Sequence, residues 1–383
     1  MRINEINVYK LLLPFSEEFT HSLRKRSSVK NVIVEIIADH GEIIGYGEGA
    51  PRSYVTGETQ KSAAKAIKGL IKQYSFPWEL NDVTQIWNFI DGLSDTKEKN
   101  SAICALEISL LDALAKTDKR PIMYYFPSEF LTDRIHYGAA VPLGSGKRVM
   151  EIYQLINKMN INKLRLKMGK NLKENSDKIE TVKRMLGDDC DLRIDVNGAW
   201  NRELAFAHIP LIKNNKVKVV EQPFSTDDPD ISEFAYEMEK YGVVMMADEQ
   251  ASTKTDVERI INEGHYKMIN VRLSKCGGFR RSLDIIELIR SKGISFQIGC
   301  QLGESGILSA AGRALCLLCR DAAYYDGSYD AFLLKENITI EDVSFGVGGK
   351  AGPLGGVGLG VQVSRQALRR LSDSDIITIK NPN

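Results

Sequence analysis

Residues 192–196 read Leu-Arg-Ile-Asp-Val, a short apolar β-type run with a carboxylate near its end. The same pattern recurs from about residue 135 onward, where short β-type runs alternate with helical segments such as Asp177–Met185 and Ser282–Ser291. This alternation predicts a parallel sheet with helical crossovers, and seven or more such units favour a closed β/α barrel over an open sheet. The β-type runs are His136–Val141, Lys163–Met168, Leu192–Val196, Val217–Val220, Val243–Ala247, Met268–Leu273 and Ile294–Ile298.

The N-terminal third has a different rhythm. A β-rich run at Asn31–Ala38 is followed by helical patterns at Glu58–Tyr74 and Ala102–Ala115, which together predict an α+β unit. The chain has 383 residues, a length that fits one large and one smaller domain. We therefore expect an α+β domain over 1–125, a barrel over 126–354, and a Gly-rich tail over about 355–383 that returns to the first domain.

Composition excludes several classes of protein. The net charge of +1 gives no electrostatic reason to expect nucleic acid or an anionic membrane as a partner. No apolar run is long enough to span a bilayer, and the first residues lack a signal-peptide pattern, so we expect a cytoplasmic protein. Cys316 and Cys319 form a C-x-x-C pair without the second pair that a zinc site needs, so we expect the cysteines to be free thiols packed in the core.

Charged residues end five successive β-type runs. They lie 26 to 28 positions apart, about one strand–helix unit each, and are Lys167, Asp195, Glu221, Asp248 and Lys275. In a β/α barrel the carboxyl ends of all strands meet at one face, so these side chains should converge there. A single strand-end acid is usually a helix cap or a surface residue. Five charges in this register and order instead favour an active site.

The residue types indicate the chemistry. Three converging carboxylates would repel one another without a cation, and all-oxygen ligands suit Mg²⁺, with Mn²⁺ as an alternative. An ammonium group near such a cation is destabilised, and a neutral lysine is a usable general base. We therefore expect Asp195, Glu221 and Asp248 to bind the metal, and Lys167 and Lys275 to lie on either side of a small carboxylate substrate.

With these strand-end residues, the sequence resembles the enolase superfamily, specifically its muconate-lactonizing enzyme subgroup. The resemblance covers nearly the whole chain and rests on Arg165-Leu166-Lys167-Met168-Gly169, Asp195-Val196-Asn197, Glu221-Gln222-Pro223, Ala247-Asp248-Glu249 and Lys275-Cys276-Gly277-Gly278. It implies an α+β capping domain made from both termini and a modified (β/α)7β barrel. It also implies an enzyme in which a Lys or His base acts with Mg²⁺.

The resemblance favours the branch with two lysines. Other branches use a histidine after the seventh strand, whereas none of His21, His40, His136, His208 and His265 falls at a matching strand end. Arg165 stands where the family usually has a further lysine, and it supplies charge without carrying protons. We expect Arg165, Asn197 and Glu249 to support the metal site electrostatically.

The substrate-binding residues are predicted from local similarity to dipeptide epimerases. Arg24 precedes the Asn31–Ala38 strand, and Tyr54 and Thr56 lie in a loop that resembles a second specificity loop of those enzymes. Glu304 follows the seventh strand. Ser328 and Asp330 are assigned to the place where those enzymes hold a substrate ammonium with two aspartates, so half of that clamp is missing.

The predicted reaction is removal of the proton α to a substrate carboxylate, giving a metal-stabilised enolate. The leading hypothesis is a racemase or epimerase of an amino-acid derivative or dipeptide. A muconate-type cycloisomerase or an o-succinylbenzoate synthase-type dehydratase is the alternative, and a non-catalytic, metal-dependent ligand-binding homologue is a third. Family membership also suggests a homo-oligomer.

Overall fold

The computed structural model describes all residues except 22–23, 74, 144–146, 188–189 and 383, and it describes no side chain for 17–26, 73 and 147–148. The N-terminal part begins with a four-stranded antiparallel sheet whose spatial order is β14-β1-β2-β3. Its strands are β1 (Ile3–His21), β2 (Arg24–Ala38), β3 (Ile43–Gly49) and β14 (Ile377–Lys380). The longest pairing is between β1 and β2, which runs from Ile3 to His21 with register shifts between Ile3 and Glu5 and between Pro14 and Phe19.

Three helices follow this sheet: α1 (Gln60–Gln73), α2 (Val83–Asp91) and α3 (Asn100–Thr117). Helix α3 packs directly on β3, where Gly45, Gly47 and Gly49 alternate along one face. A Cβ atom on any of the three would overlap α3 backbone atoms, so the absence of side chains permits this close approach. The run of small and apolar residues predicted as a helix is therefore buried on nearly every face.

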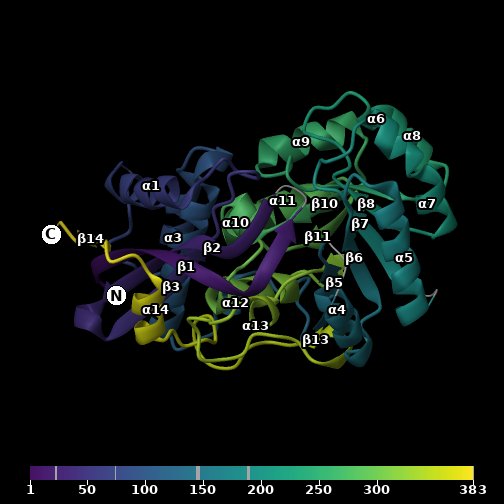
Figure 1. The fold of residues 1–383 in the computed structure, drawn as a ribbon. Helices are drawn as coiled ribbons and strands as arrows, with labels where there is room; N and C mark the ends of the chain where they lie inside the picture. The colour runs from purple at the N-terminus through teal and green to yellow at the C-terminus, as the bar shows by residue number, and fades with distance from the viewer. Residues whose placement is uncertain (22–23, 74, 144–146, 188–189, 383) are drawn as a thin grey trace.

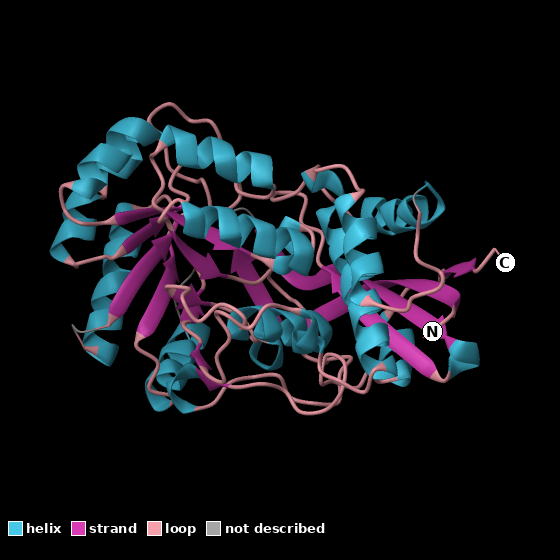
Figure 2. Ribbon diagram, turned by 180° about the vertical axis from the view of Figure 1, so that it is seen from behind, coloured by secondary structure: helices cyan, strands magenta, loops and turns pink. Residues whose placement is uncertain are grey.

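Eight parallel strands form the second part, in the spatial order β12-β11-β10-β9-β8-β7-β6-β5. Their bounds are β5 (Ala139–Val141), β6 (Lys163–Lys167), β7 (Asp191–Asp195), β8 (Val219–Glu221), β9 (Val244–Ala247), β10 (Met268–Val271), β11 (Ser295–Ile298) and β12 (Tyr324–Tyr325). The two edge strands meet through a hydrogen bond from the Gly138 N–H to the Tyr325 carbonyl at 2.8 Å. This confirms the predicted (β/α)7β barrel fold with a capping α+β part, seen from two sides in Figures 1 and 2.

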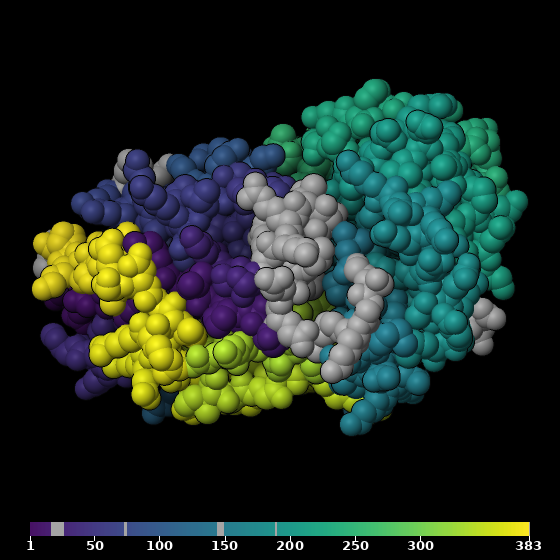
Figure 3. Space-filling model, viewed as in Figure 1, coloured from purple at the N-terminus to yellow at the C-terminus, as the bar shows by residue number. Residues whose placement is uncertain are grey.

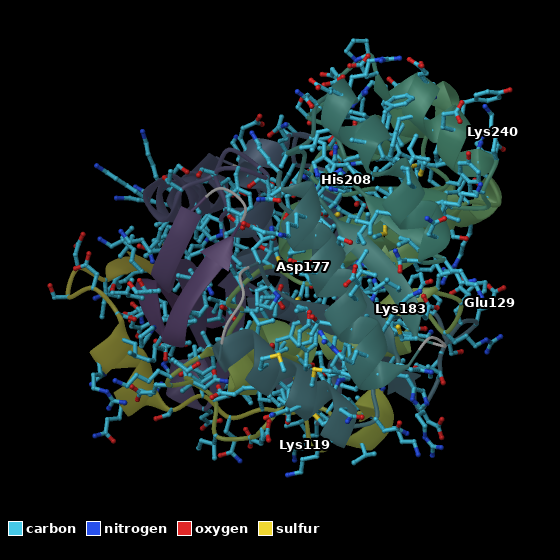
Figure 4. The ribbon with its side chains drawn as sticks, turned by 45° about the vertical axis from the view of Figure 1, so that its right-hand side comes forward. Lys119, Glu129, Asp177, Lys183, His208 and Lys240 are labelled. Atoms are coloured by element: carbon cyan, nitrogen blue, oxygen red, sulfur yellow. The ribbon has the colours of Figure 1, made fainter. Side chains whose placement is uncertain are left out.

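Helices follow the barrel strands and cover their outer side (Figure 1). They are α4 (Lys147–Lys158), α5 (Leu172–Leu186), α6 (Arg202–Ala207), α7 (Ile209–Asn214), α8 (Ile231–Glu239), α9 (Lys254–Glu263), α10 (Leu273–Cys276), α11 (Phe279–Ser291) and α12 (Gly306–Leu317). His208, labelled in Figure 4, is buried, and its ring stacks on that of Trp200 with the ring centroids 4.1 Å apart. Among the described residues, no helix is both long enough and apolar enough to cross a membrane.

The chain returns to the N-terminal sheet at its end. After α13 (Asp330–Leu333), the segment passes a two-residue strand pair, β4 (Ile135–His136) with β13 (Lys350–Ala351). Helix α14 (Arg365–Leu371) and β14 then lie against β1, with Glu5 opposite Lys380. Figure 3 shows this C-terminal segment, in yellow, against the purple N-terminal residues.

Candidate active site

Three carboxylates lie at the carboxyl ends of adjacent barrel strands, as predicted. Asp195 ends β7, Glu221 ends β8 and Asp248 directly follows β9. Asp195 and Glu221 are partners in the β7–β8 register. All three side chains are fully buried. Parallel strands end on the same face of the barrel, so positions far apart in sequence come together here.

Two arginines lie among these carboxylates. The Nη1 of Arg165 is 2.8 Å from Asp195 Oδ2 and 3.1 Å from Glu221 Oε2. The Nη2 of Arg272 contacts Asp248 Oδ2 and lies 3.5 Å from Glu221 Oε1. Each guanidinium group therefore bridges two of the three acids, and Glu221 touches both.

Arg272 is missing from the sequence-based predictions. It directly follows strand β10 and is therefore itself a charged strand-end residue, which is the signal that marks it. Lys275, which the sequence assigned to this strand end, lies instead in the short helix α10. The strand ends four residues before Lys275, so Arg272 has the position in the barrel that the spacing argument gave to the lysine.

Lys167 ends β6 and faces the site. Its Nζ donates to Asp195 Oδ2 at 2.5 Å and to Asn197 Oδ1 at 2.8 Å. Asn197 adopts a left-handed backbone conformation with φ of 51°, and its own amide group donates to Glu249 Oε1 at 2.9 Å. The predicted neighbours Asn197 and Glu249 are thus brought next to Lys167 and Asp195.

Lys275 is held inside the protein. Its Nζ donates to the backbone oxygens of Asp248 at 2.7 Å and Asn270 at 2.5 Å, and to Asp248 Oδ1 at 3.1 Å. The side chain is fully buried, and it is not among the described residues that line the cavity above the site. Its geometry is that of a cation that fixes Asp248.

The carboxyl groups differ in their proton affinity. Burial would raise the pKa of Asp195, but the Lys167 ammonium and the Arg165 guanidinium hold it below its ordinary value. Arg272 and Lys275 likewise hold the pKa of Asp248 low against the effect of burial. Burial, and then the Asp195 carboxylate, raise the pKa of Glu221 to about 8. The two guanidinium groups that touch Glu221 therefore do not offset its burial and the negative charge beside it.

A hard divalent cation would supply further positive charge to the triad. The triad offers only carboxylate oxygens, the preferred ligands of Mg²⁺, from three neighbouring strands. As they stand, no three His, Cys, Asp or Glu side chains in the described part of the chain surround one ion position. The reason is visible at Arg272, whose guanidinium lies between Glu221 and Asp248. A cation bound by the triad would displace that guanidinium from the carboxylates.

A cavity of about 530 Å³ opens above these groups. Arg165, Lys167 and Arg272 lie on its charged side. Its other side is largely apolar, and much of it comes from helix α4 and the residues after it, including Ile152, Leu155, Ile156 and Met159. The cavity is large enough for a drug-sized ligand, and it can receive a molecule that has one anionic end and an apolar group.

Four of the predicted substrate contacts line this cavity: Tyr54, Glu304, Ser328 and Asp330. The Ser328 hydroxyl accepts from Arg313 at 3.2 Å, and Asp330 Oδ2 accepts from Asn337 at 2.7 Å. Glu304 Oε1 accepts from the Gln301 N–H at 2.6 Å, and burial raises the pKa of Glu304 to about 8.

The other two predicted contacts are not placed in the cavity. Thr56 is buried and is not among the described lining residues, because its hydroxyl donates to Glu58 Oε2 at 2.8 Å. Glu58 in turn accepts from the Ser101 N–H, so this part of the loop is tied to helix α3. The side chain of Arg24 lies outside the described residues.

Two further groups complete the site. Asp326, directly after β12, lies 2.9 Å from Arg165 Nε and 3.0 Å from Arg193 Nη2. Asn270, in β10, donates to Glu221 Oε1 at 2.8 Å. Asn270 lies within the predicted run Met268–Leu273, where only its burial distinguishes it from an ordinary polar strand residue. Asp326 follows β12, a strand that is not among the predicted runs.

Proteins of similar sequence match most of the chain. The chain is 27% identical over 316 residues to the hydrophobic dipeptide epimerase of Enterococcus faecalis, covering 81% of this chain and 86% of that protein. It is 25% identical over 313 residues to the N-succinyl-L-Arg/Lys racemase of Bacillus cereus, covering 82% and 83%.

Solved structures show the same fold. The N-succinyl Arg/Lys racemase from Bacillus cereus superimposes with a TM-score of 0.85 at 23% identity, covering 99% of this chain and 100% of that one. A muconate lactonizing enzyme from Pseudomonas fluorescens gives 0.83 at 20% identity, covering 97% and 99%. The family model described as enolase C-terminal domain-like matches residues 148–367. Because this match covers more than half of the chain, the protein belongs to the enolase C-terminal domain-like family, as its strand-end motifs predicted.

Proposed function

We propose that this enzyme removes the proton next to the carboxylate of an amino-acid derivative or dipeptide, giving an enolate. The observation that carries the proposal is Lys167, a lysine at the cavity wall whose Nζ lies 2.5 Å from a carboxylate of the triad. The relatives support this substrate class, since their names are those of a dipeptide epimerase and an N-succinyl amino acid racemase. They favour a racemase or epimerase within the isomerases and lyases of the superfamily.

Lys167 is the base in this proposal. Asn197 Oδ1 and Asp195 Oδ2 orient its Nζ, and a neutral amine at this point can take the α-proton. Asp195, Glu221 and Asp248 would hold Mg²⁺ or Mn²⁺, which would supply positive charge beside the substrate carboxylate. Arg165 adds a permanent positive charge to the same wall.

The cavity supports a substrate with an apolar group. The wall formed by Ile152, Leu155, Ile156 and Met159 can bury such a group while the carboxylate lies against the cations. A free ammonium has fewer partners, because Ser328 stands beside Asp330 and both already bond to neighbouring side chains. The apolar wall therefore suits an N-acylated amino acid or a hydrophobic dipeptide, and the scarcity of partners for an ammonium favours the N-acylated amino acid of the two.

The enolate has two possible fates. Reprotonation on the opposite face gives a racemase or epimerase, the fate favoured by the names of the relatives. Ring closure or loss of water gives a cycloisomerase or dehydratase. That second fate is supported by a specific observation: the group that faces the cavity from strand β10 is Arg272 and not a lysine.

The test is isotope exchange at the α-carbon. We expect the protein with Mg²⁺ in D₂O to exchange the α-proton of at least one member of a panel of N-succinyl amino acids and hydrophobic dipeptides, followed by ¹H NMR. Lys167→Ala should lower the exchange rate by about 10²–10⁴-fold. Lys170→Ala, three residues later on the surface, is the matched control and should exchange at the rate of the unmodified protein. Metal-dependent ligand binding without any exchange would instead identify a non-catalytic homologue.

A further inference from the structure

The two sides of the barrel mouth present different cations to the cavity. Lys167 ends β6, and Arg272 follows β10. In the sheet order, β7, β8 and β9 separate these strands in one direction, and β11, β12 and β5 separate them in the other. The Gly138–Tyr325 hydrogen bond joins the edges, so β6 and β10 lie on opposite sides of the barrel. Lys167 and Arg272 therefore face a substrate from opposite walls.

A guanidinium group cannot replace a lysine as a proton carrier. It has five N–H donors, no acceptor atom, and stays charged in proteins. In Arg272, Nη1 donates to Gln301 Oε1 at 3.2 Å, and Nη2 contacts Asp248, the contact that a cation bound by the triad would replace. The Arg272 wall thus supplies charge and hydrogen bonds.

Lys275 does not restore a proton carrier to that wall. Three oxygen atoms surround its Nζ, two of them backbone carbonyls, and its backbone oxygen accepts from Asn100 Nδ2 at 2.7 Å. Lys275 is not among the described residues that line the cavity, and reaching the cavity would require its ammonium to leave all three oxygens.

We infer that Lys167 carries protons at this site, that no group on the β10 wall does so, and that Arg272 is a permanent cation, so that the α-proton leaves and returns on one face of the substrate. This inference rests on the proposed function. Of the two fates of the enolate it favours ring closure or loss of water, whereas the names of the relatives favour a racemase or epimerase. Lys167 Nζ takes the proton while the C–H electron pair enters the enolate. The same ammonium then returns a proton to the same face with retained configuration, unless the substrate closes a ring or loses a leaving group first.

The experiment compares substrates that differ only in the configuration of the reacting carbon. The probes are L-Leu-L-Tyr with L-Leu-D-Tyr, and N-succinyl-L-lysine with N-succinyl-D-lysine, incubated with the protein and Mg²⁺ in D₂O. We expect deuterium to enter one member of a pair with retained configuration, and to enter the other member at least about 10²-fold more slowly. ¹H NMR gives the exchange, and chiral chromatography gives the configuration.

Exchange into both members at similar rates, or their interconversion, would overturn the inference. If that happened, Glu304→Gln would show whether the Glu304 carboxyl is the second carrier. Absence of exchange in every probe would overturn the proposed function for these substrate classes, and the inference with it. The two failures are therefore distinguishable.

A variant tests the role of Arg272 directly. Arg272→Lys keeps the positive charge beside Asp248 and introduces a proton carrier. We expect it to raise exchange in the slow member by about 10²-fold or more and to interconvert the pair. Arg272→Gln removes the charge without adding a carrier, and it should leave exchange confined to one member. If Arg272→Lys exchanged only the original member, the β10 wall would not face the reacting carbon and the inference would be wrong.

Discussion

A buried carboxyl group without a cation partner behaves differently from the paired acids of the triad. Asp195 and Asp248 each contact at least two cationic side chains, and their pKa values are lowered against burial. Burial is the largest influence on Glu304, which accepts one strong hydrogen bond from a backbone N–H, and it raises the pKa of Glu304 to about 8. These individual carboxyl groups therefore make the stability of the protein depend on pH.

Ionisation of Glu304 should lower the free energy of unfolding as the pH rises. Its folded pKa of about 8 exceeds the ordinary value of about 4.3, so the folded state holds a proton that the unfolded chain releases. The contribution is complete below about pH 4 and is lost as the pH rises through about 8, at up to about 1.4 kcal/mol per pH unit. Glu304→Gln, which is neutral at every pH, should flatten this part of the profile.

Urea unfolding at a series of pH values between these limits measures the effect. Glu239→Gln, at an exposed position at the end of α8, is the control and should keep the slope of the unmodified protein. Identical slopes for Glu304→Gln and the unmodified protein would show that the carboxyl is ionised in the folded state.

At the scale of elements, the contact between β3 and α3 depends on missing side chains. Gly45, Gly47 and Gly49 face Ser109, Ala105 and Ser101, one helical turn apart, so the strand and the helix share a seam of backbone contacts. The seam positions α3, whose Asn100 and Glu107 bond to the loops after β9 and β10. Local packing in the N-terminal part thus reaches the active-site side of the barrel.

Gly47→Ala should separate these elements. The added methyl would overlap the backbone oxygen of Ala105, and overpacking of this kind lowers the free energy of unfolding by about 1–3 kcal/mol. Gly69→Ala, in the middle of α1 with open space around its Cα, is the matched control and should raise it by about 0.5–1 kcal/mol. Chemical denaturation measures both free energies of unfolding. Equal changes in the two variants would show that the contact between β3 and α3 does not depend on the missing side chain at Gly47.

At the scale of the molecule, the cap and the barrel are joined by buried polar contacts. Glu48, in β3, accepts from the backbone N–H groups of Ser305 and Leu308 at the start of α12. Helix α3 reaches the loops after β9 and β10 in the same way. The loop after β9, which begins with Asp248, is therefore held by both parts of the protein, and a cation bound by the triad should stabilise the whole fold.

Metal binding should consequently appear as thermal stability. A cation present at about 100 times its dissociation constant adds about 2.7 kcal/mol to the free energy of unfolding. We expect Mg²⁺ to raise the melting temperature of the unmodified protein and EDTA to reverse the change. Asp195→Asn should lose the response, and the exposed Asp177→Asn should keep it. A melting temperature that is the same with and without the cation in the unmodified protein would count against the metal site.

The sequence alone predicted the barrel and the strand-end positions of Lys167, Asp195, Glu221 and Asp248. It did so because hydrophobic alternation is local and because parallel strands bring their carboxyl ends to one face.

The tertiary structure alone decided which way neighbouring side chains point. Arg272 and Lys275 are three residues apart, and α10 begins between them; Arg272 lines the cavity, whereas Lys275 is bonded to Asp248 and Asn270. Thr56, likewise, turns to Glu58 because α3 packs beside its loop. Such directions depend on contacts between distant segments, which no local pattern contains.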